Sequence, residues 1–165
     1  MTDSGTGRTV RLFHRSWELE CCGKPFSVGD EVAWPLVFED VPAADAEIWA
    51  DCLDGRGRLR VATLHGGAPE KGSGAPWVAG RVRSIQVVVV GYRAAEPVPG
   101  ERWLRPVEHC PRWFAGRVEE GADGADGTGP GAGPRAKGGG GRCAYHRAEC
   151  GVIVEVDVAC GERRA

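Results

Sequence analysis

Two groups of cysteines are the residues whose types and spacing point most directly to chemistry. Cys143, His146 and Cys150 form a C-x2-H-x3-C run, and thiolates and imidazoles at such spacings are zinc ligands. A structural zinc site takes four ligands. The possible fourth ligands are Cys21, Cys22, His109 and Cys110, of which we include Cys22 in the predicted set. Only half of a zinc signature is present, so thiols that bind no metal are the alternative.

The second group is the adjacent pair Cys21 and Cys22, followed by Gly23. Nearby cations such as Arg15 or Lys24 would favour a thiolate, which is the reactive form of cysteine in redox chemistry. The alternative is packing, because cysteine often behaves as a small buried hydrophobe. Adjacent side chains of an extended chain point in opposite directions, so we expect one thiol to be buried and the other exposed.

Sequence motifs of catalysis are missing from the chain. It contains no G-x-S-x-G elbow, no P-loop and no H-E-x-x-H run. A cysteine nucleophile at position 21 or 22 would need His14, His65 or His109 brought beside it by the fold. We therefore expect no catalytic residue and no cofactor beyond a possible zinc ion, and a protein that is not an enzyme.

Two other features suggest binding surfaces. Arg58 and Arg60 share one face of an expected strand and suit phosphate groups, yet 21 basic against 23 acidic residues leave a net charge of −2, which disfavours a nucleic-acid partner. Trp113 is expected to be exposed, and an exposed tryptophan suits a contact with a protein partner. The possible binding surface thus consists of Cys21, Arg58, Arg60 and Trp113.

Alternating apolar residues predict most of the secondary structure as strands. The clearest strand carries Val32, Trp34, Leu36 and Phe38 on one face, which places Trp34 in the core. Pro35 cannot donate a ladder hydrogen bond, so it marks an edge strand, which we favour, or a break. Further strands are expected near residues 10–14, 59–61, 103–107 and 152–158, and residues 77–92 are expected to form one or two strands buried on both faces.

One short amphipathic helix is expected at residues 43–53, after Pro42 and before Gly55, with an apolar stripe at Ile48, Trp49 and Cys52. The fold class is therefore mainly β (α+β): a small, partly open β-barrel of SH3-like or OB-like character with one helix. Residues 9–114 and 143–160 form its single domain, after a flexible N-terminus at residues 1–8. Between them, residues 115–142 include 11 glycines among 28 residues and are expected to be a disordered insert.

Composition also indicates a compartment. The polar N-terminus lacks the apolar run of a secretory signal, and the longest aliphatic run, residues 87–90, is far too short to span a membrane. Seven cysteines, an odd number, favour thiols over a disulfide framework. These features predict a cytoplasmic protein that does not span a membrane.

The run E-C-C-G-K-P-F-S-V-G-D-E-V-A-W at residues 20–34 resembles a family of small, uncharacterised proteins of high-GC bacteria, defined as a domain of unknown function. The resemblance continues through Trp17, residues 80–92 and residues 152–157. It implies no activity.

From these features together, we expect a non-catalytic binding or interaction module with a protein partner. The alternative is a small zinc-binding or thiol-redox protein that uses Cys21, Cys22, Cys143, His146 and Cys150.

Overall fold

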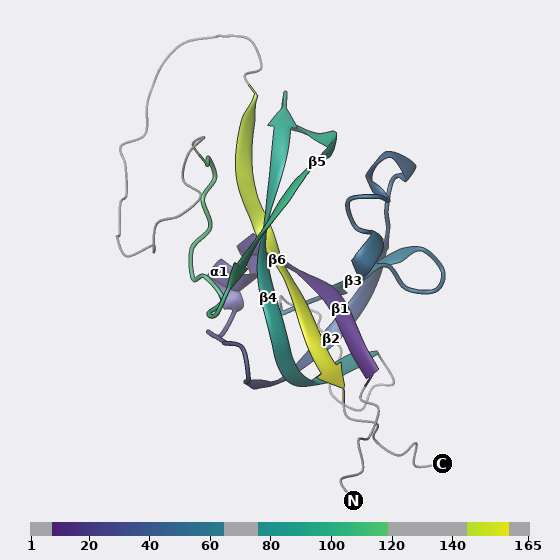
Figure 1. Cartoon of the computed structure of the whole chain (residues 1–165), viewed down its shortest axis with the longest axis vertical. Coiled ribbons are helices and arrows are strands. Elements are labelled where there is room, and N and C mark those ends of the chain that lie inside the picture. Colours follow the sequence, from purple (N-terminus) through teal and green to yellow (C-terminus); the bar gives the residue numbers. More distant parts are fainter. Residues whose placement is uncertain (1–7, 65–75, 119–144, 159–165) are drawn as a thin grey trace, which may run out of the picture.

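The structure is a computed structural model that describes residues 8–64, 76–118 and 145–158 (Figure 1). Expectations for the N-terminal segment, for Cys143 and for most of the glycine-rich insert lie outside the described residues. Six strands make up most of the described part of the chain. They are β1 (Arg8–Arg15), β2 (Glu31–Asp40), β3 (Arg58–Ala62), β4 (Trp77–Arg93), β5 (Glu96–Val107) and β6 (His146–Val158).

Five of these strands close into a barrel. The strand order is β2-β3-β1-β6-β4-β5, and an additional pairing of β2 with β4 joins the two sides of the ring. The sixth strand, β5, lies outside that ring and forms a hairpin with β4. This hairpin and the neighbouring end of β6 extend beyond the barrel (Figure 1). The mainly β class and the small barrel are thus confirmed, and the barrel is closed where the sequence suggested a partly open one.

The closure depends on a change of partner within β2. Residues 31–35 of this strand pair with β4, whereas residues 36–40 pair with β3. Pro35 lies at the change and donates no hydrogen bond, but its carbonyl accepts one from Thr63 at 3.0 Å. Pro35 therefore marks a break inside a strand with two partners, and the edge position that we favoured is wrong.

The barrel interior is filled by one side of each strand. Leu12, Trp34, Ile85 and Val154 belong to this core, and Trp34 is only 8% exposed, as its strand pattern predicts. A second apolar cluster lies on the outer side of β1, β3, β4 and β6 and includes Phe13, Val61 and Val88. The segment between β2 and β3 covers it, which explains why residues 87–90 of β4 are buried on both faces. Residues 77–86 of the same strand instead alternate between buried and more exposed positions, so burial on both faces holds only for the second part of β4.

The predicted helix at residues 43–53 is wrong. This segment forms two short 3-10 turns, η1 (Ala43–Asp45) and η2 (Ala50–Cys52), which are separated by residues 46–49; the last of these, Trp49, has φ −106° and ψ 8°. The apolar stripe that suggested a helix exists, since Ile48 and Cys52 are buried, but it docks a compact loop onto the barrel.

The α-helix of the described residues is instead α1 (Ser16–Cys22), which follows β1 directly. Seven residues are too few for a helix to form from sequence preference alone. Two of its carboxylates fix it to the rest of the fold. Glu18, which is buried, accepts a hydrogen bond from the Leu64 amide at 2.7 Å, and Glu20 accepts one from the Phe114 amide at 2.8 Å. Tertiary hydrogen bonds thus stabilise α1.

The chain returns to the barrel close to where it leaves. The amide of Val118 donates to the carbonyl of Arg147 at 2.8 Å, and the amide of Glu149 donates to the carbonyl of Ala115 at 2.8 Å. Residues 115–118 therefore lie against the first part of β6, which begins six residues earlier than the strand expected from the sequence.

Candidate binding site

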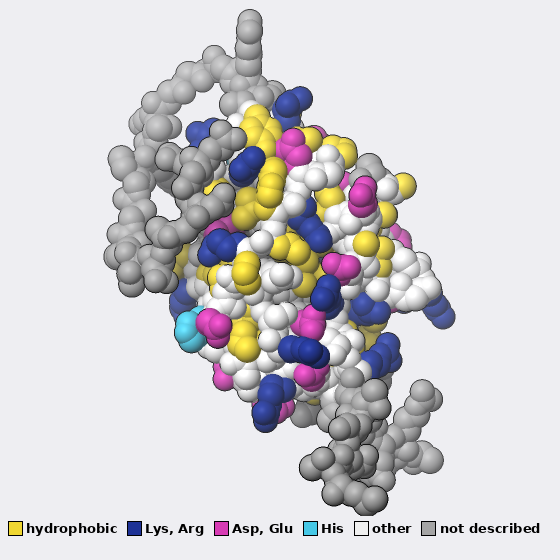
Figure 2. Space-filling view, viewed as in Figure 1, with side chains coloured by type: hydrophobic (Ala, Val, Ile, Leu, Met, Phe, Trp, Pro, Cys, Tyr) yellow, Lys and Arg dark blue, Asp and Glu magenta, His cyan; other side chains and the backbone are white. Residues whose placement is uncertain are grey.

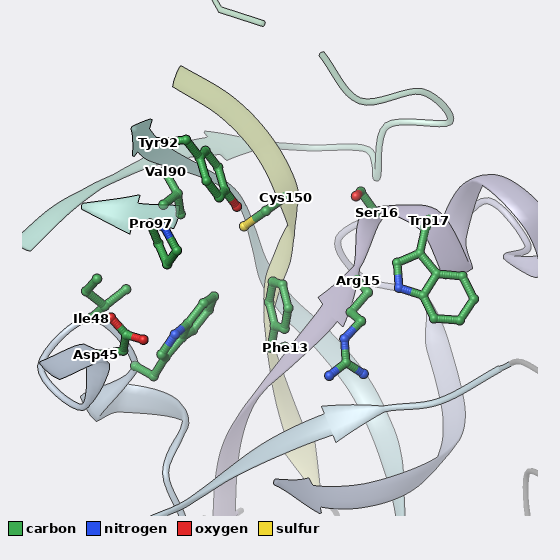
Figure 3. Close-up of a pocket in the computed structure, with 11 residues that line it drawn as sticks. Phe13, Arg15, Ser16, Trp17, Asp45, Ile48, Val90, Tyr92, Pro97 and Cys150 are labelled. Atoms are coloured by element: carbon green, nitrogen blue, oxygen red, sulfur yellow. The ribbon is translucent and has the colours of Figure 1, made fainter. Parts of the chain in front are cut away.

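A pocket of about 370 Å³ opens on the outer side of the barrel (Figure 3). It lies between the start of α1, the loop that carries η1 and η2, and the hairpin of β4 and β5. Its lining residues come from all of these elements and from β1 and β6. They are Phe13, Arg15, Ser16, Trp17, Asp45, Ile48, Trp49, Val90, Tyr92, Pro97 and Cys150.

Aromatic and aliphatic side chains form most of the pocket wall. Phe13 occupies the middle of the pocket, with Val90, Tyr92 and Pro97 on one side and Trp17 on the other (Figure 3). The ring of Phe13 packs against that of Trp49 with centroids 4.6 Å apart. Phe13 points outward because its neighbours in β1 point into the barrel, so the period of the strand supplies the pocket floor.

Polar groups are confined to the rim. Arg15 and Asp45 lie on opposite sides of the opening, and Ser16 lies beside Arg15 (Figure 3). The Arg15 guanidinium donates a hydrogen bond to the carboxylate of Glu39 and forms an ion pair with it. The rim therefore combines both charges with a hydroxyl and has no strong preference for a ligand of either sign. Trp17 is 50% exposed at this rim.

The cysteine and the tyrosine of the pocket both have raised pKa values. Burial raises the pKa of the Cys150 thiol to about 12, so this thiol stays protonated and is a weak nucleophile near neutral pH. Burial and the nearby Cys150 also raise the pKa of Tyr92, which keeps its hydroxyl neutral. The arrangement can hold an apolar ligand, and neither Cys150 nor Tyr92 is an activated nucleophile at neutral pH.

The histidines considered as bases lie in different surroundings. His14 is fully buried inside the barrel, with its ring 4.7 Å from that of Trp34, and burial lowers its pKa to about 3. The Nδ1 atom of His109 and the hydroxyl of Ser27 form a hydrogen bond of 2.8 Å. His65 lies outside the described residues.

The predicted zinc ligands are distributed over the fold. His146 and Cys150 both lie on β6, where four steps of extended chain, at about 3.3 Å each, separate their Cα atoms by about 13 Å. Cys22 ends α1, and Cys143 lies outside the described residues. Within residues 8–64, 76–118 and 145–158, no three His, Cys, Asp or Glu side chains are grouped so as to hold a metal ion. A zinc site that includes Cys143 stays a prediction.

The structure corrects the expected orientation of the adjacent cysteines. Both Cys21 and Cys22 are exposed, and their Sγ atoms lie 2.7 Å apart. The expectation of one buried thiol assumed an extended chain with opposed side chains. These residues are the last two of α1, where successive side chains are about 100° apart, so both thiols face solvent together.

The remaining predicted surface residues are separate from the pocket. Arg58 donates two hydrogen bonds to Asp54, at 3.2 and 2.9 Å, and lies over the ring of Phe38. Arg60 lines a second, polar hollow of about 400 Å³ together with Arg11 and Glu155, and none of these three residues lines the aromatic pocket. Trp113 is 70% exposed, as expected from its position. A role of these residues in binding stays a prediction.

The residues that form the pocket were not predicted from the sequence. Trp49 was expected in a helix and Phe13 in the strand near residues 10–14, and neither was expected to line a pocket. The available signal was the alternation of β1, which gives Phe13 and Arg15 a common outward face. What covers that face depends on where the loop of η1 and η2 docks, and no local pattern contains that information.

Comparison with known proteins addresses family membership and leaves function open. The comparisons found no matching curated protein and no matching solved structure. A model of a family of unknown function matches residues 8–158, which include every strand of the barrel and every residue of the pocket. The resemblance noted from residues 20–34 is thereby confirmed at the level of the family. The chain belongs to the family of unknown function DUF6578.

Proposed function

We propose that the protein is a non-catalytic binding module that holds a protein partner in the aromatic pocket on the outer side of its barrel. The observation that supports this most strongly is the pocket itself: Phe13, Trp49 and Tyr92 enclose a volume of about 370 Å³ that is open to solvent. Burial raises the pKa values of its cysteine and its tyrosine, Cys150 and Tyr92, so binding suits the pocket better than nucleophilic chemistry at these two side chains.

The occupant that fits best is an extended segment of a partner protein with one large apolar side chain. Such a side chain would enter between Phe13 and Pro97, and the main chain beside it would meet the hydroxyl of Ser16 and the carboxylate of Asp45. Trp17 would extend the contact beyond the pocket, because it is half exposed at the rim. Aromatic residues in such positions commonly dominate the energy of an interface.

A protein partner agrees better with the surface charge than a nucleic acid does. Basic and acidic side chains are interspersed on the face shown in Figure 2, and the net charge is −2.

Among the described residues, no helix has the length and apolar character that a membrane span requires. We also propose a cytoplasmic location, which is supported by the thiols of Cys52, Cys110 and Cys150, since none of the three is in a disulfide within the described part of the chain.

Selection of random peptides on the full-length chain tests this proposal. The peptides that are enriched should share one large apolar residue, and Trp17→Ala should weaken their binding about tenfold or more, as measured by calorimetry. The comparison variant is Trp113→Ala, at the exposed tryptophan of the binding surface expected from the sequence, which does not line the pocket; if the pocket is the site, this variant should leave the affinity unchanged. Binding that Trp113→Ala abolishes and Trp17→Ala preserves would place the interface elsewhere and refute the pocket as the site.

A further inference from the structure

The end of α1 carries two thiols in direct contact. Cys21 and Cys22 are exposed, their Sγ atoms lie 2.7 Å apart, and the pair forms an S–H···S hydrogen bond. We propose that Cys21 and Cys22 form a reversible vicinal disulfide, which makes the end of α1 a site of redox modification. This inference concerns a surface other than the pocket and does not depend on the proposed function.

The sulfur atoms need little movement to form the bond. A disulfide has an S–S distance of about 2.0 Å, so the two atoms must approach by about 0.7 Å from their separation of 2.7 Å. The backbone there can adjust, because Cys22 is the last helical residue and Gly23 is already extended, with φ −71° and ψ 140°. Both thiols are open to a reagent in solution.

The same geometry implies that the disulfide is easily reduced. The Cα atoms of adjacent residues are only about 3.8 Å apart, whereas disulfides ordinarily join Cα atoms about 4.4–6.8 Å apart. The ring that contains Cys21 and Cys22 is therefore strained. Strained and exposed disulfides have higher reduction potentials than structural ones and serve as labile, regulatory bonds.

The oxidant would be a small-molecule disulfide such as oxidised glutathione. One cysteine thiolate attacks this disulfide, which forms a mixed disulfide and releases the first small thiol. The neighbouring thiolate then attacks the cysteine sulfur of the mixed disulfide, closes the Cys21–Cys22 bond and releases the second small thiol. Two electrons pass to the oxidant, and the two protons of the cysteines end on the two released thiols.

Oxidation should rearrange only the last turn of α1. The Gly23 amide donates to the Leu19 carbonyl at 3.1 Å, and a change of backbone at Cys22 would break this bond. The preceding residues stay anchored, because Glu18 and Glu20 hold their hydrogen bonds to Leu64 and Phe114. We therefore expect the oxidised protein to keep its barrel.

Mass spectrometry of the oxidised full-length chain tests the inference. After treatment with excess oxidised glutathione and alkylation of the remaining thiols, cleavage after glutamate releases a peptide from Cys21 to Glu31, with these two cysteines alone. It should carry no alkyl group and should lack the mass of two hydrogen atoms. Treatment with a reducing thiol should restore both alkylation sites. The hydrogen bond with Cys21 raises the pKa of Cys22, so this thiol is mostly protonated near neutral pH. Because the thiolate is the form that attacks a disulfide, the rate of oxidation should rise with pH.

Single variants separate this bond from other thiol chemistry. Cys21→Ser and Cys22→Ser should each retain one glutathionyl group, since no neighbouring thiol remains to displace it. Cys110→Ser, the control at a partly buried cysteine, should leave the mass loss of the peptide unchanged. Full alkylation of the wild-type peptide after oxidation, or a stable glutathionyl group on it, would overturn the inference while leaving the peptide-binding test of the pocket unaffected.

Discussion

At the scale of single residues, His14 is the least expected feature of the core. Its ring is fully buried between Trp34 and Phe26, and neither ring nitrogen has a hydrogen-bond partner among the described residues. A charged imidazolium would be costly there, and burial lowers the pKa of His14 to about 3. The barrel therefore accepts this histidine only in its neutral form.

Acid should destabilise the fold through His14. The folded pKa of about 3 lies below the ordinary value of 6.5, so the unfolded chain takes up a proton first and stability falls as the pH drops below 6.5. We expect the free energy of unfolding to fall by about 2 kcal/mol between pH 7.5 and pH 5 from this residue. Urea titrations of the wild type and of His14→Leu measure the effect, and an equal loss in both would contradict it.

At the scale of elements, the strands could be predicted and the helix could not. Alternation in residues 32–38 reports a strand with one buried face whatever its partners are, and β2 is found there. The helical spacing of Ile48, Trp49 and Cys52 is equally regular, yet these residues dock a loop. Conversely, α1 is held by Glu18 and Glu20 through contacts with residues distant in sequence. The pocket shares this dependence on tertiary contacts, so its residues were missed.

The irregularity in β6 gives a test at the same scale. Gly151 has φ +152° and lies at a register shift between β4 and β6, and a Cβ atom at this position would lie 2.0 Å from the carbonyl oxygen of His14. Gly151→Ala should therefore lower the stability by about 3 kcal/mol, from steric overlap and backbone strain together. Gly55→Ala is the matched control, because a Cβ atom there meets nothing within 4 Å. Thermal unfolding of both variants measures the difference, and equal stabilities would refute the predicted close approach.

At the scale of the whole molecule, the connection between β5 and β6 is fixed to the barrel at both of its ends. The hydrogen bonds of Ala115 and Val118 to β6 fix the chain on one side of the connection, and β6 fixes it on the other. Replacement of residues 119–144 by a shorter Gly/Ser linker should therefore leave the melting temperature within a few degrees of the wild type. Loss of cooperative unfolding, measured by calorimetry, would show that the replaced segment contributes to the fold.

The pairing of the first strand with the last has a mechanical consequence. Arg8 lies opposite Val158 at one end of an antiparallel pair that continues to Arg15 opposite Gly151. A force that pulls residues 8 and 158 apart therefore loads the hydrogen bonds at that end of the pair first, and the hydrogen bonds between β1 and β6 break one after another. The same force between residues 8 and 146 would load the ladder in shear, with its bonds resisting together. Tension through the segments that flank the barrel should thus open it at a much lower force than tension across the ladder.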